Sequence, residues 1–449
     1  MDKINVLFVS SELAPIIKVG GLADVAGALP KCLLDFINIQ VVIPKYKIIP
    51  TPAPETIPGS DVKINYIDIP EYFSSRDNVY GYPDDPIRFA MFSQKVVQDI
   101  KDEKFGRVDI VHINDYHTSL IPILLKDIGL NNVKTMLTIH NLGPAYQGRY
   151  SLEILDALKL QKYHSTIEID KSDNQINLLL QGVLNANIVS TVSSTYAKEI
   201  LTKEYGGEIE DFMELRKSSL YGILNGIDYS IYDPDKDEKI YFKYNISNYK
   251  MGKLENKKKL IDELHLKFGT DTPIFAFISR LDYQKGIDIL IKAMEALETK
   301  NVNFIILGTG AKDFEDQLQI LGTKNPSLFA DITFDITLAE KIYAGADALI
   351  IPSRYEPSGL TQMIAMKYGT LPIVRSTGGL KDSVEGLVSG FTFEDYSPLS
   401  LVNTLKEALS MFNTPKWDEI IQTAMNEDFS WERSAEKYVA LYQHLVSNL

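Results

Sequence analysis

The feature that most constrains this chain is a repeating pattern of short apolar runs separated by stretches of helical length. The runs are rich in β-branched residues and apolar on both faces, which is typical of parallel strands buried between helices. They lie at residues 5–10, 40–44, 109–114, 135–140, 187–193, 222–226, 273–279, 303–308, 331–336, 348–353 and 371–376. The segments between them have a helical period, and one predicted helix places five apolar residues on one face: Ile287, Leu290, Ile291, Met294 and Leu297. The pattern predicts an α/β fold.

The strand series divides into two parts of similar size. Residues 232–260 are rich in tyrosine and lysine and interrupt the alternation of strand and helix. We therefore place the domain linker there and expect domains at residues 1–235 and 236–429. The lysines of residues 253–260 are interpreted as a solvated helix face, the usual fate of a charge run. Open parallel sheets bind ligands outside the carboxyl ends of their strands.

Charge and cysteine content exclude several classes of protein. The 449 residues include 46 Lys and Arg against 60 Asp and Glu, for a formal net charge of −14, which disfavours binding to nucleic acid or anionic membranes. The single cysteine, Cys32, cannot form an intramolecular disulfide. The N-terminal apolar run is too short for a signal peptide, and no stretch is long enough for a membrane helix. The sequence predicts a soluble cytoplasmic protein.

A glycine loop follows the first predicted strand. Lys18, Gly20 and Gly21 precede a helical segment, so a lysine charge, accessible backbone and free helix amides occur together, as a phosphate site requires. An ordinary turn from strand to helix is the alternative. The spacing of Gly20, Gly21 and Gly27 is not the G-x-G-x-x-G of dinucleotide-binding proteins, and no G-x-x-x-x-G-K-[ST] motif occurs. The sequence therefore argues against an NAD dehydrogenase and a Walker-type ATPase.

Two segments of the second domain suggest an anion and sugar site. Arg280 and Lys285 lie at a strand end, where two cations could neutralise a departing pyrophosphate. Glu356 follows another strand and precedes Gly359 and Thr361 at a predicted helix start, so it could bind sugar hydroxyls while the helix amides bind phosphate. The alternatives are surface cations and ordinary helix capping by Ser358 or Thr361.

Among the six histidines, position favours His140. It ends a predicted strand and is followed by Asn141, whereas His112 and His117 are the next candidates. A structural or surface role is the default for His164, His265 and His444. The histidines do not form an H-x-x-x-H or Cys/His pattern, so no metal site is predicted.

Five segments together resemble bacterial glycogen synthase and plant starch synthase. They are KVGGLADV, SRLDYQKG, PSRYEPSGLTQ, STGGL and FSWERSAEKY, and the match extends over essentially the whole chain. The resemblance implies the GT-B fold, in which two Rossmann-like domains face a cleft, and a terminal helix, here residues 430–449, that crosses back to the N-terminal domain. It also implies a retaining transferase that adds glucose from ADP-glucose to the non-reducing end of an α-1,4-glucan, without a cofactor or a metal. UDP-glucose remains an alternative donor.

The resemblance also implies roles for individual residues. Arg280, Lys285, Glu356 and His140 would form the catalytic group, with the two cations on the diphosphate. Asp115 and Tyr116 would contact the acceptor glucan. The remaining residues would bind the donor or line the sugar sites: Glu12, Lys18, Gly20, Gly21, Asp24, Asn225, Phe334, Gly359, Leu360 and Thr361.

The chain departs from the family pattern at two places. Asn114 and Tyr116 stand where the family usually has histidine and tryptophan, so we expect altered acceptor affinity, since tyrosine still stacks on a sugar face. Phe334 replaces a tyrosine that packs on adenine. Two rival functions remain: a GT-B glycosyltransferase with a different acceptor, and a catalytically weak glucan-binding or regulatory paralogue. The number of subunits is not predicted.

Overall fold

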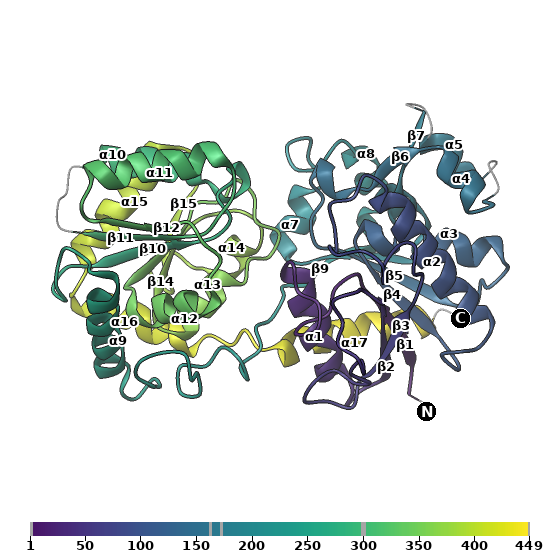
Figure 1. Cartoon of the computed structure of the whole chain (residues 1–449), viewed down its shortest axis with the longest axis horizontal. Helices are drawn as coiled ribbons and strands as arrows, with labels where there is room; N and C mark the ends of the chain where they lie inside the picture. The colour runs from purple at the N-terminus through teal and green to yellow at the C-terminus, as the bar shows by residue number, and fades with distance from the viewer. Residues whose placement is uncertain (1–2, 161–163, 171–173, 298–301, 448–449) are drawn as a thin grey trace. The chain divides into compact units, whose positions relative to one another are not determined.

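The chain folds into two compact units. The computed structural model describes residues 3–160, 164–170, 174–297 and 302–447. Unit 1 comprises Met1–Gly226 and Trp431–Leu449, and unit 2 comprises Ile227–Ser430 (Figure 1). The chain thus leaves unit 1 before residue 227 and returns to it at its C-terminal helix.

Unit 1 contains a seven-stranded parallel sheet with the order β3-β2-β1-β4-β5-β8-β9. The strands are β1 (Asn5–Val9), β2 (Asn38–Pro44), β3 (Lys63–Ile67), β4 (Ile110–Asn114), β5 (Lys134–Ile139), β8 (Ile188–Thr191) and β9 (Leu220–Gly222). A separate antiparallel pair is formed by β6 (Arg149–Ser151) and β7 (Gln175–Asn177). From β1 the chain adds β2 and β3 on one side of the sheet, and it then adds β4 and the later strands on the other side. The loops after β1 and β4 therefore diverge, and ligands of open parallel sheets bind at such a point.

Helices cover both faces of this sheet (Figure 1). One layer contains α1 (Gly21–Leu33) and α17 (Trp431–Ser447), which pack on each other. The other layer includes α2 (Asp85–Lys101), α3 (Ile121–Asp127) and α6 (Leu178–Asn185). Shorter helices are α4 (Glu153–Ala157), α5 (Ser165–Asp170), α7 (Ser194–Glu199), α8 (Glu210–Leu215), η1 (Tyr116–Thr118), η2 (Pro144–Tyr146) and η4 (Lys217–Ser219).

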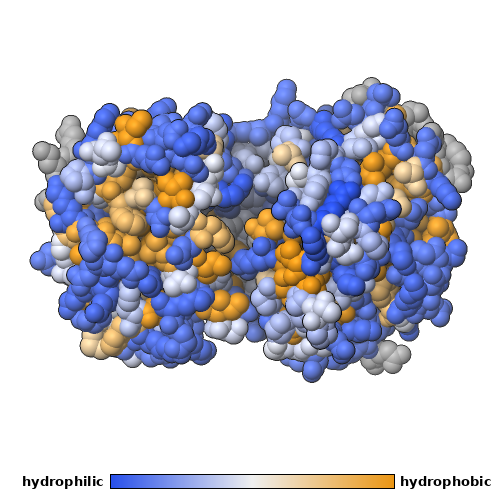
Figure 2. Space-filling model, in the orientation of Figure 1, coloured by the Kyte–Doolittle hydropathy of each residue, from blue (hydrophilic) through white to orange (hydrophobic). Residues whose placement is uncertain are grey.

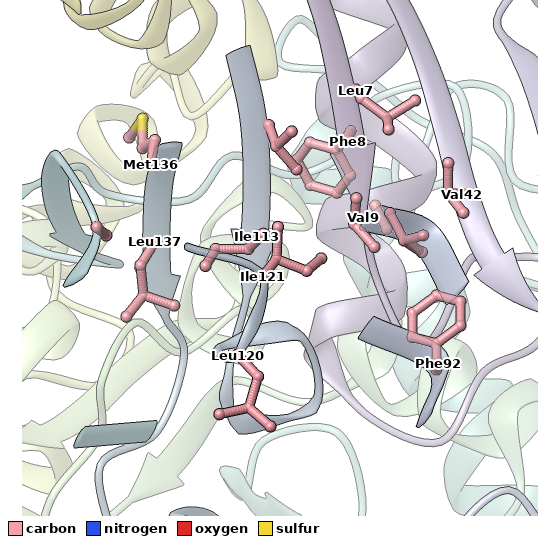
Figure 3. Packing of buried hydrophobic residues seen from close by; sticks show 14 of the residues in the cluster. Leu7, Phe8, Val9, Val42, Phe92, Ile113, Leu120, Ile121, Met136 and Leu137 are labelled. Atoms are coloured by element: carbon pink, nitrogen blue, oxygen red, sulfur yellow. The ribbon is translucent and has the colours of Figure 1, made fainter. Parts of the chain in front are cut away.

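The core of unit 1 is built from the two faces of the parallel strands. Successive side chains of a strand point to opposite faces, so an apolar run buries residues under both helix layers. Figure 3 shows labelled side chains from this packing, contributed by neighbouring strands and by α2 and α3. They are Leu7, Phe8, Val9, Val42, Phe92, Ile113, Leu120, Ile121, Met136 and Leu137.

Helix α17 is bound to unit 1 by polar as well as apolar contacts. Tyr442 places its hydroxyl 2.6 Å from Nδ1 of His112, and Ser434 donates to the carbonyl oxygen of Leu224 at 2.6 Å. Tyr438 and Tyr442 are both fully buried. The terminal helix is therefore part of the core of unit 1.

Unit 2 has a six-stranded parallel sheet with the order β12-β11-β10-β13-β14-β15. Its strands are β10 (Ile274–Ile278), β11 (Asn303–Leu307), β12 (Leu328–Asp331), β13 (Ala348–Ile351), β14 (Leu371–Arg375) and β15 (Phe391–Phe393). Helices α10 (Ile287–Ala296), α11 (Lys312–Lys324) and α15 (Pro398–Met411) form one layer, and the opposite layer holds α9 (Tyr249–Leu264), α12 (Ile336–Gly345), α13 (Thr361–Lys367) and α16 (Pro415–Asn426) (Figure 1). Two short elements are η5 (Tyr283–Lys285) and α14 (Gly378–Ser383).

Two of the predicted strands are displaced. Residues 331–336 were expected to form a strand, but β12 ends at Asp331, and Asp335 instead caps α12 by accepting the amide of Leu338 at 2.9 Å. Residues 222–226 likewise extend beyond β9, which ends at Gly222. Strands β3 and β15 were not predicted; the mixed polar composition of β3 and the three-residue length of β15 give only a weak strand signal.

The predicted linker is largely ordered structure of unit 2. The domain boundary was expected after residue 235, whereas the units divide after Gly226. The reason is local pairing: Ile227 forms a β-bridge with Ser430, and the hydroxyl of Tyr229 accepts the amide of Phe429 at 2.9 Å. Residues 249–264 form α9, which packs on α12.

The lysines of α9 do not all lie on a solvated face, and that part of the prediction is wrong. Lys257 is 4% exposed and forms an ion pair with Asp347 at 2.8 Å. Lys253 is also buried, and its Nζ donates to Thr370 Oγ1 at 2.8 Å and to two backbone carbonyl oxygens. The acceptors that satisfy these ammonium groups come from distant parts of the chain, so a local charge pattern could not reveal them.

This arrangement predicts unequal effects for two lysines of one helix. Lys257→Ala is expected to lower the free energy of unfolding by about 3 kcal/mol, because the Asp347 carboxylate, whose side chain is only 13% exposed, would lose its cation. Lys258→Ala, which removes only an exposed pair with Glu255, is expected to cost less than about 1 kcal/mol. Urea unfolding of both variants measures the difference, and equal losses would contradict the assignment.

The surface differs in character from the cores. On the face shown in Figure 2, hydrophilic residues predominate over each unit and hydrophobic residues gather in smaller patches. Within the described part of the chain, no helix has the length and apolar character needed to cross a membrane.

Candidate active site

Most of the predicted site residues follow strands that flank the two points where the strand order reverses, whereas His140 follows β5, Asn225 follows β9 and Phe334 follows β12. In unit 1 the reversal lies between β1 and β4, and in unit 2 it lies between β10 and β13. Glu12 and Lys18 follow β1, Asp115 follows β4, Arg280 and Lys285 follow β10, and Glu356 follows β13. Such reversal points are the usual ligand-binding positions of open parallel sheets. The topology thus gives each unit its own set of candidate ligand-binding loops.

In unit 1 the glycine loop is shaped by Glu12. This carboxylate is 4% exposed, and its Oε2 accepts the amides of Val19 at 2.6 Å and Gly20 at 2.8 Å. Its Oε1 accepts the hydroxyl of Tyr80 at 2.8 Å. Lys18 pairs with Asp24 at 2.7 Å and is 39% exposed. The ammonium group is therefore accessible, while the loop amides on the Glu12 side are already occupied.

Asp115 lies at the end of β4 and contacts the predicted catalytic histidine. It has a φ of 53°, and its Oδ1 accepts the backbone amide of His140 at 2.7 Å. Burial raises the pKa of Asp115 to about 7, although backbone hydrogen bonds from His140 and Asn141 oppose this rise. The carboxyl group is held in place by backbone rather than by a cation.

Tyr116 is part of an aromatic cluster next to Asp115. Its ring centroid lies 3.9 Å from that of His117, which in turn lies 5.0 Å from Tyr80 and 4.5 Å from Phe89. Gly148 packs against the face of Tyr116 so closely that an added Cβ would lie 2.3 Å from Cδ2. The Tyr116 ring is therefore fixed by its neighbours.

In unit 2 an ion pair joins two predicted catalytic residues. Nζ of Lys285 lies 2.7 Å from Oε2 of Glu356, which also accepts the hydroxyl of Ser353 at 3.0 Å. The side chain of Lys285 is 19% exposed and that of Glu356 is 9% exposed. Arg280 is more open, at 55%, and pairs with Asp282 at 2.9 Å. The structure thus brings together Lys285 and Glu356, which are 71 residues apart in sequence.

The loop before α13 is held by a glutamine, not by a capping hydroxyl. Leu360 is the residue before the helix, and no side chain caps it, so the interpretation of Ser358 or Thr361 as a cap is wrong. Nε2 of Gln362 instead donates to the carbonyl oxygens of Ser358 and Gly359, each at 3.0 Å. Gly359 has a φ of +70°, and an added Cβ would lie 2.4 Å from the Gln362 side chain. The loop therefore requires both glycine and glutamine.

Two residues predicted to bind the nucleotide-sugar donor or to line the sugar sites take part in none of these contacts. Phe334 follows β12 and is 84% exposed, which leaves its ring free to stack on a planar ligand. Asn225 is buried, and its Oδ1 has no hydrogen-bond partner among the described residues. Both remain predictions. Sequence reasoning missed Tyr80 and Ser353, which no motif identifies, and Gln362, which ends the segment E-P-S-G-L-T-Q.

The other two candidate histidines are structural. His112 contacts Tyr442 and Thr138 inside the core, and His117 lies in the aromatic cluster. Burial lowers the pKa of each to about 3. Both rings are therefore neutral at neutral pH.

The neutral His112 makes stability depend on pH. The unfolded chain binds a proton at His112 below about pH 6.5 and the folded chain does not, so stability falls as the pH falls toward 3. Between pH 7.5 and pH 5, the free energy of unfolding of the native chain is expected to fall by about 2 kcal/mol more than that of His112→Gln. Urea titrations at both pH values measure this, with the exposed His444→Gln as control. An unchanged pH dependence in His112→Gln would refute it.

The acidic side chains and histidines of the site are dispersed rather than clustered. Among residues 3–160, 164–170, 174–297 and 302–447, no group of three or more His, Cys, Asp or Glu side chains could hold a metal ion. Asp115 and Glu356 instead make the hydrogen bonds and the ion pair given above.

Comparison with known proteins agrees with the division of the chain into two units. Residues 5–215 match the family described as starch synthase catalytic domain, and residues 261–424 match glycosyl transferases group 1. The glycogen synthase of Thermotoga petrophila is 39% identical, with 99% of each chain covered, and that of Fervidobacterium nodosum is 40% identical with the same coverage. The catalytic domain of starch synthase IV from Arabidopsis thaliana, bound to ADP and acarbose, superposes with a TM-score of 0.89 at 29% identity over the whole of both chains.

Two parallel α/β units with ligand loops at their strand reversals, one matching each family, define a glycosyltransferase of the GT-B fold. The chain belongs to the glycogen synthase family. Enzymes of this family transfer glucose from a nucleotide-sugar donor to a glucan acceptor. The resemblance in sequence, the fold class and the enzyme class are thus confirmed.

Proposed function

We propose that the donor is ADP-glucose and that glucose is added with retention of configuration to the non-reducing end of an α-1,4-glucan. The observation that carries this proposal is the largely buried pair of Lys285 and Glu356 at the strand reversal of unit 2. The pair consists of a cation and a carboxylate, and Glu356 precedes Gly359 in the loop that leads into α13. The ADP bound to the related starch synthase IV supports an adenine nucleotide as donor.

In this proposal unit 2 stabilises the leaving group. Lys285 and the more exposed Arg280 bind the diphosphate, and backbone amides between Gly359 and Thr361 add further donors. As the glycosidic bond stretches, negative charge grows on the diphosphate and positive charge on the sugar ring. Cations already held in place stabilise that charge without reorganisation. Glu356 accepts sugar hydroxyls, and Phe334 stacks on the base.

Unit 1 supplies groups for the transferred glucose and the glucan. His140 would contact a hydroxyl of the transferred glucose, and Asp115 and Tyr116 would contact the acceptor. Lys18 and the backbone at Gly21 would bind the donor phosphate, while Gly20, whose amide already donates to Glu12, would only allow the ligand to approach. Asp24 holds Lys18 by an ion pair. Glu12 supports that loop, and Asn225 offers its unpartnered oxygen to a sugar hydroxyl.

The direct test is incorporation of label into polymer. Incubation with glycogen and ADP-[14C]glucose is expected to give labelled glucan, whereas UDP-[14C]glucose is expected to give less. A preference for UDP-glucose would overturn the donor assignment. Anomeric analysis by NMR of the first product on a maltooligosaccharide distinguishes retention, which gives an α-linkage, from inversion.

Turnover measurements distinguish an active enzyme from a regulatory paralogue. Native protein and the Tyr116→Trp variant are both expected to turn over, with the variant changed mainly in the KM for glucan. Turnover near the background rate in both proteins would favour the paralogue. Transfer to an acceptor other than glucan would favour a different GT-B enzyme.

A further inference from the structure

Asn114 is the residue at which the chain departs from the usual family histidine, and all four of its polar groups are engaged. It ends β4 with a fully buried side chain. Its backbone amide and carbonyl both bond to Oγ1 of Thr118, at 2.7 and 2.9 Å. Its Nδ2 donates to the carbonyl oxygen of Val9 at 3.0 Å, and its Oδ1 lies 2.9 Å from Nε2 of His140.

The contact with Val9 fixes which way the amide of Asn114 faces. A backbone carbonyl oxygen can only accept a hydrogen bond, so the atom of Asn114 that faces Val9 must be the NH2 group. The oxygen of the amide therefore faces His140. Since Oδ1 is itself only an acceptor, the Nε2 atom of His140 must carry the proton that joins them.

We propose that Asn114 is a positioning residue that holds His140 in its Nε2–H tautomer, so that Nδ1 is left as a hydrogen-bond acceptor for a hydroxyl of the transferred glucose. This inference rests on the proposed role of His140 at the sugar. A histidine at position 114 could either donate or accept, and would not impose this tautomer. Asparagine in this orientation imposes it.

The surroundings of His140 agree with a neutral ring that accepts at Nδ1. Its backbone amide is held by Asp115 Oδ1 at 2.7 Å, so the residue is fixed at both its main chain and its Nε2. Among the described residues no hydrogen bond reaches Nδ1, and the residue is partly exposed. Burial of the ring lowers the pKa of His140 to about 3, which removes the second proton at neutral pH.

The experiment is 15N NMR of the full-length protein labelled at its six histidines. In the native protein at pH 7.5, His140 is expected to show a protonated Nε2 and an unprotonated Nδ1. Asn114→Leu removes the acceptor and is expected to give a mixture of tautomers. The ring signals of His112, which bonds to Tyr442 and Thr138, report whether the core is intact.

Kinetics supply a second readout. In Asn114→Leu the KM for the nucleotide sugar is expected to rise about tenfold, the loss of one hydrogen bond to the sugar, whereas the Kd for ADP is expected to stay within twofold because ADP carries no hexose. The inference would be overturned if His140 of the native protein were protonated at Nδ1. It would also be overturned if Asn114→Leu kept the native tautomer while its His112 signals stayed intact. The NMR result does not depend on glucose transfer, so it tests the tautomer even if the proposed function fails.

Discussion

Lys285→Ala is expected to lower kcat for glucose transfer about 100- to 1000-fold, the largest effect of any single side-chain truncation in unit 2. The ammonium group lies 2.7 Å from Glu356 and would stabilise the charge that grows on the departing diphosphate. Its removal also leaves the 9% exposed Glu356 carboxylate without a cation. Steady-state kinetics with ADP-glucose and glycogen measure the loss.

Lys292→Ala is the matched control for this variant. Lys292 lies on α10, the helix that follows Lys285, but its side chain is exposed. Its loss is expected to leave kcat within twofold of the native value. If Lys285→Ala retained more than a third of native kcat while its circular dichroism stayed native, Lys285 would not act on the leaving group.

Gly378→Ala is expected to lower the free energy of unfolding by about 3 kcal/mol and to reduce transfer at the same time. Gly378 begins α14 with a φ of +45°, and an added Cβ would lie 2.0 Å from the backbone carbonyl oxygen of Glu356. Alanine must therefore adopt a strained conformation or displace the segment that carries Glu356. Urea unfolding and kinetics on the same preparation measure both effects.

Gly322→Ala provides the control for an added methyl group. Gly322 lies inside α11, and beyond its neighbours and the backbone of its own helix, a Cβ added there would meet no atom of the described residues within 4 Å. Here alanine is expected to stabilise the helix by up to about 1 kcal/mol without a change in kinetics. A Gly378→Ala variant as stable and active as Gly322→Ala would show that the segment of Glu356 tolerates displacement.

The parallel α/β fold could be predicted because its signal is local. Buried strands such as Asn5–Val9 and Ile274–Ile278 are apolar on both faces, and the period of the α10 helix is visible in its own residues. Two of the errors arose where the deciding contact was not local. The β-bridge of Ile227 to Ser430 moved the domain boundary, and the acceptors of Lys253 and Lys257 placed two lysines in the interior.

For the candidate site, too, local signals could be predicted and long-range contacts could not. Motifs identified Lys18, His140, Arg280, Lys285 and Glu356 because each follows a strand in a segment of distinctive sequence. Other contacts of the site could not be found by motif. Tyr80 reaches Glu12 across 68 residues of sequence, and Asn114 reaches His140 across 26, so only folding of the sheet makes them neighbours.

The sequence by itself determined the class of fold and the family, and it supplied the residues that we propose to meet the substrate, since all of these depend on periodicity and on short segments. Tertiary structure alone decided how the functional groups are held: which nitrogen of His140 carries its proton, which carboxylate shapes the glycine loop, and which cation faces Glu356. The physical reason is that a hydrogen bond or an ion pair requires atoms within about 3 Å. In a parallel sheet, that proximity is created by strands distant in sequence.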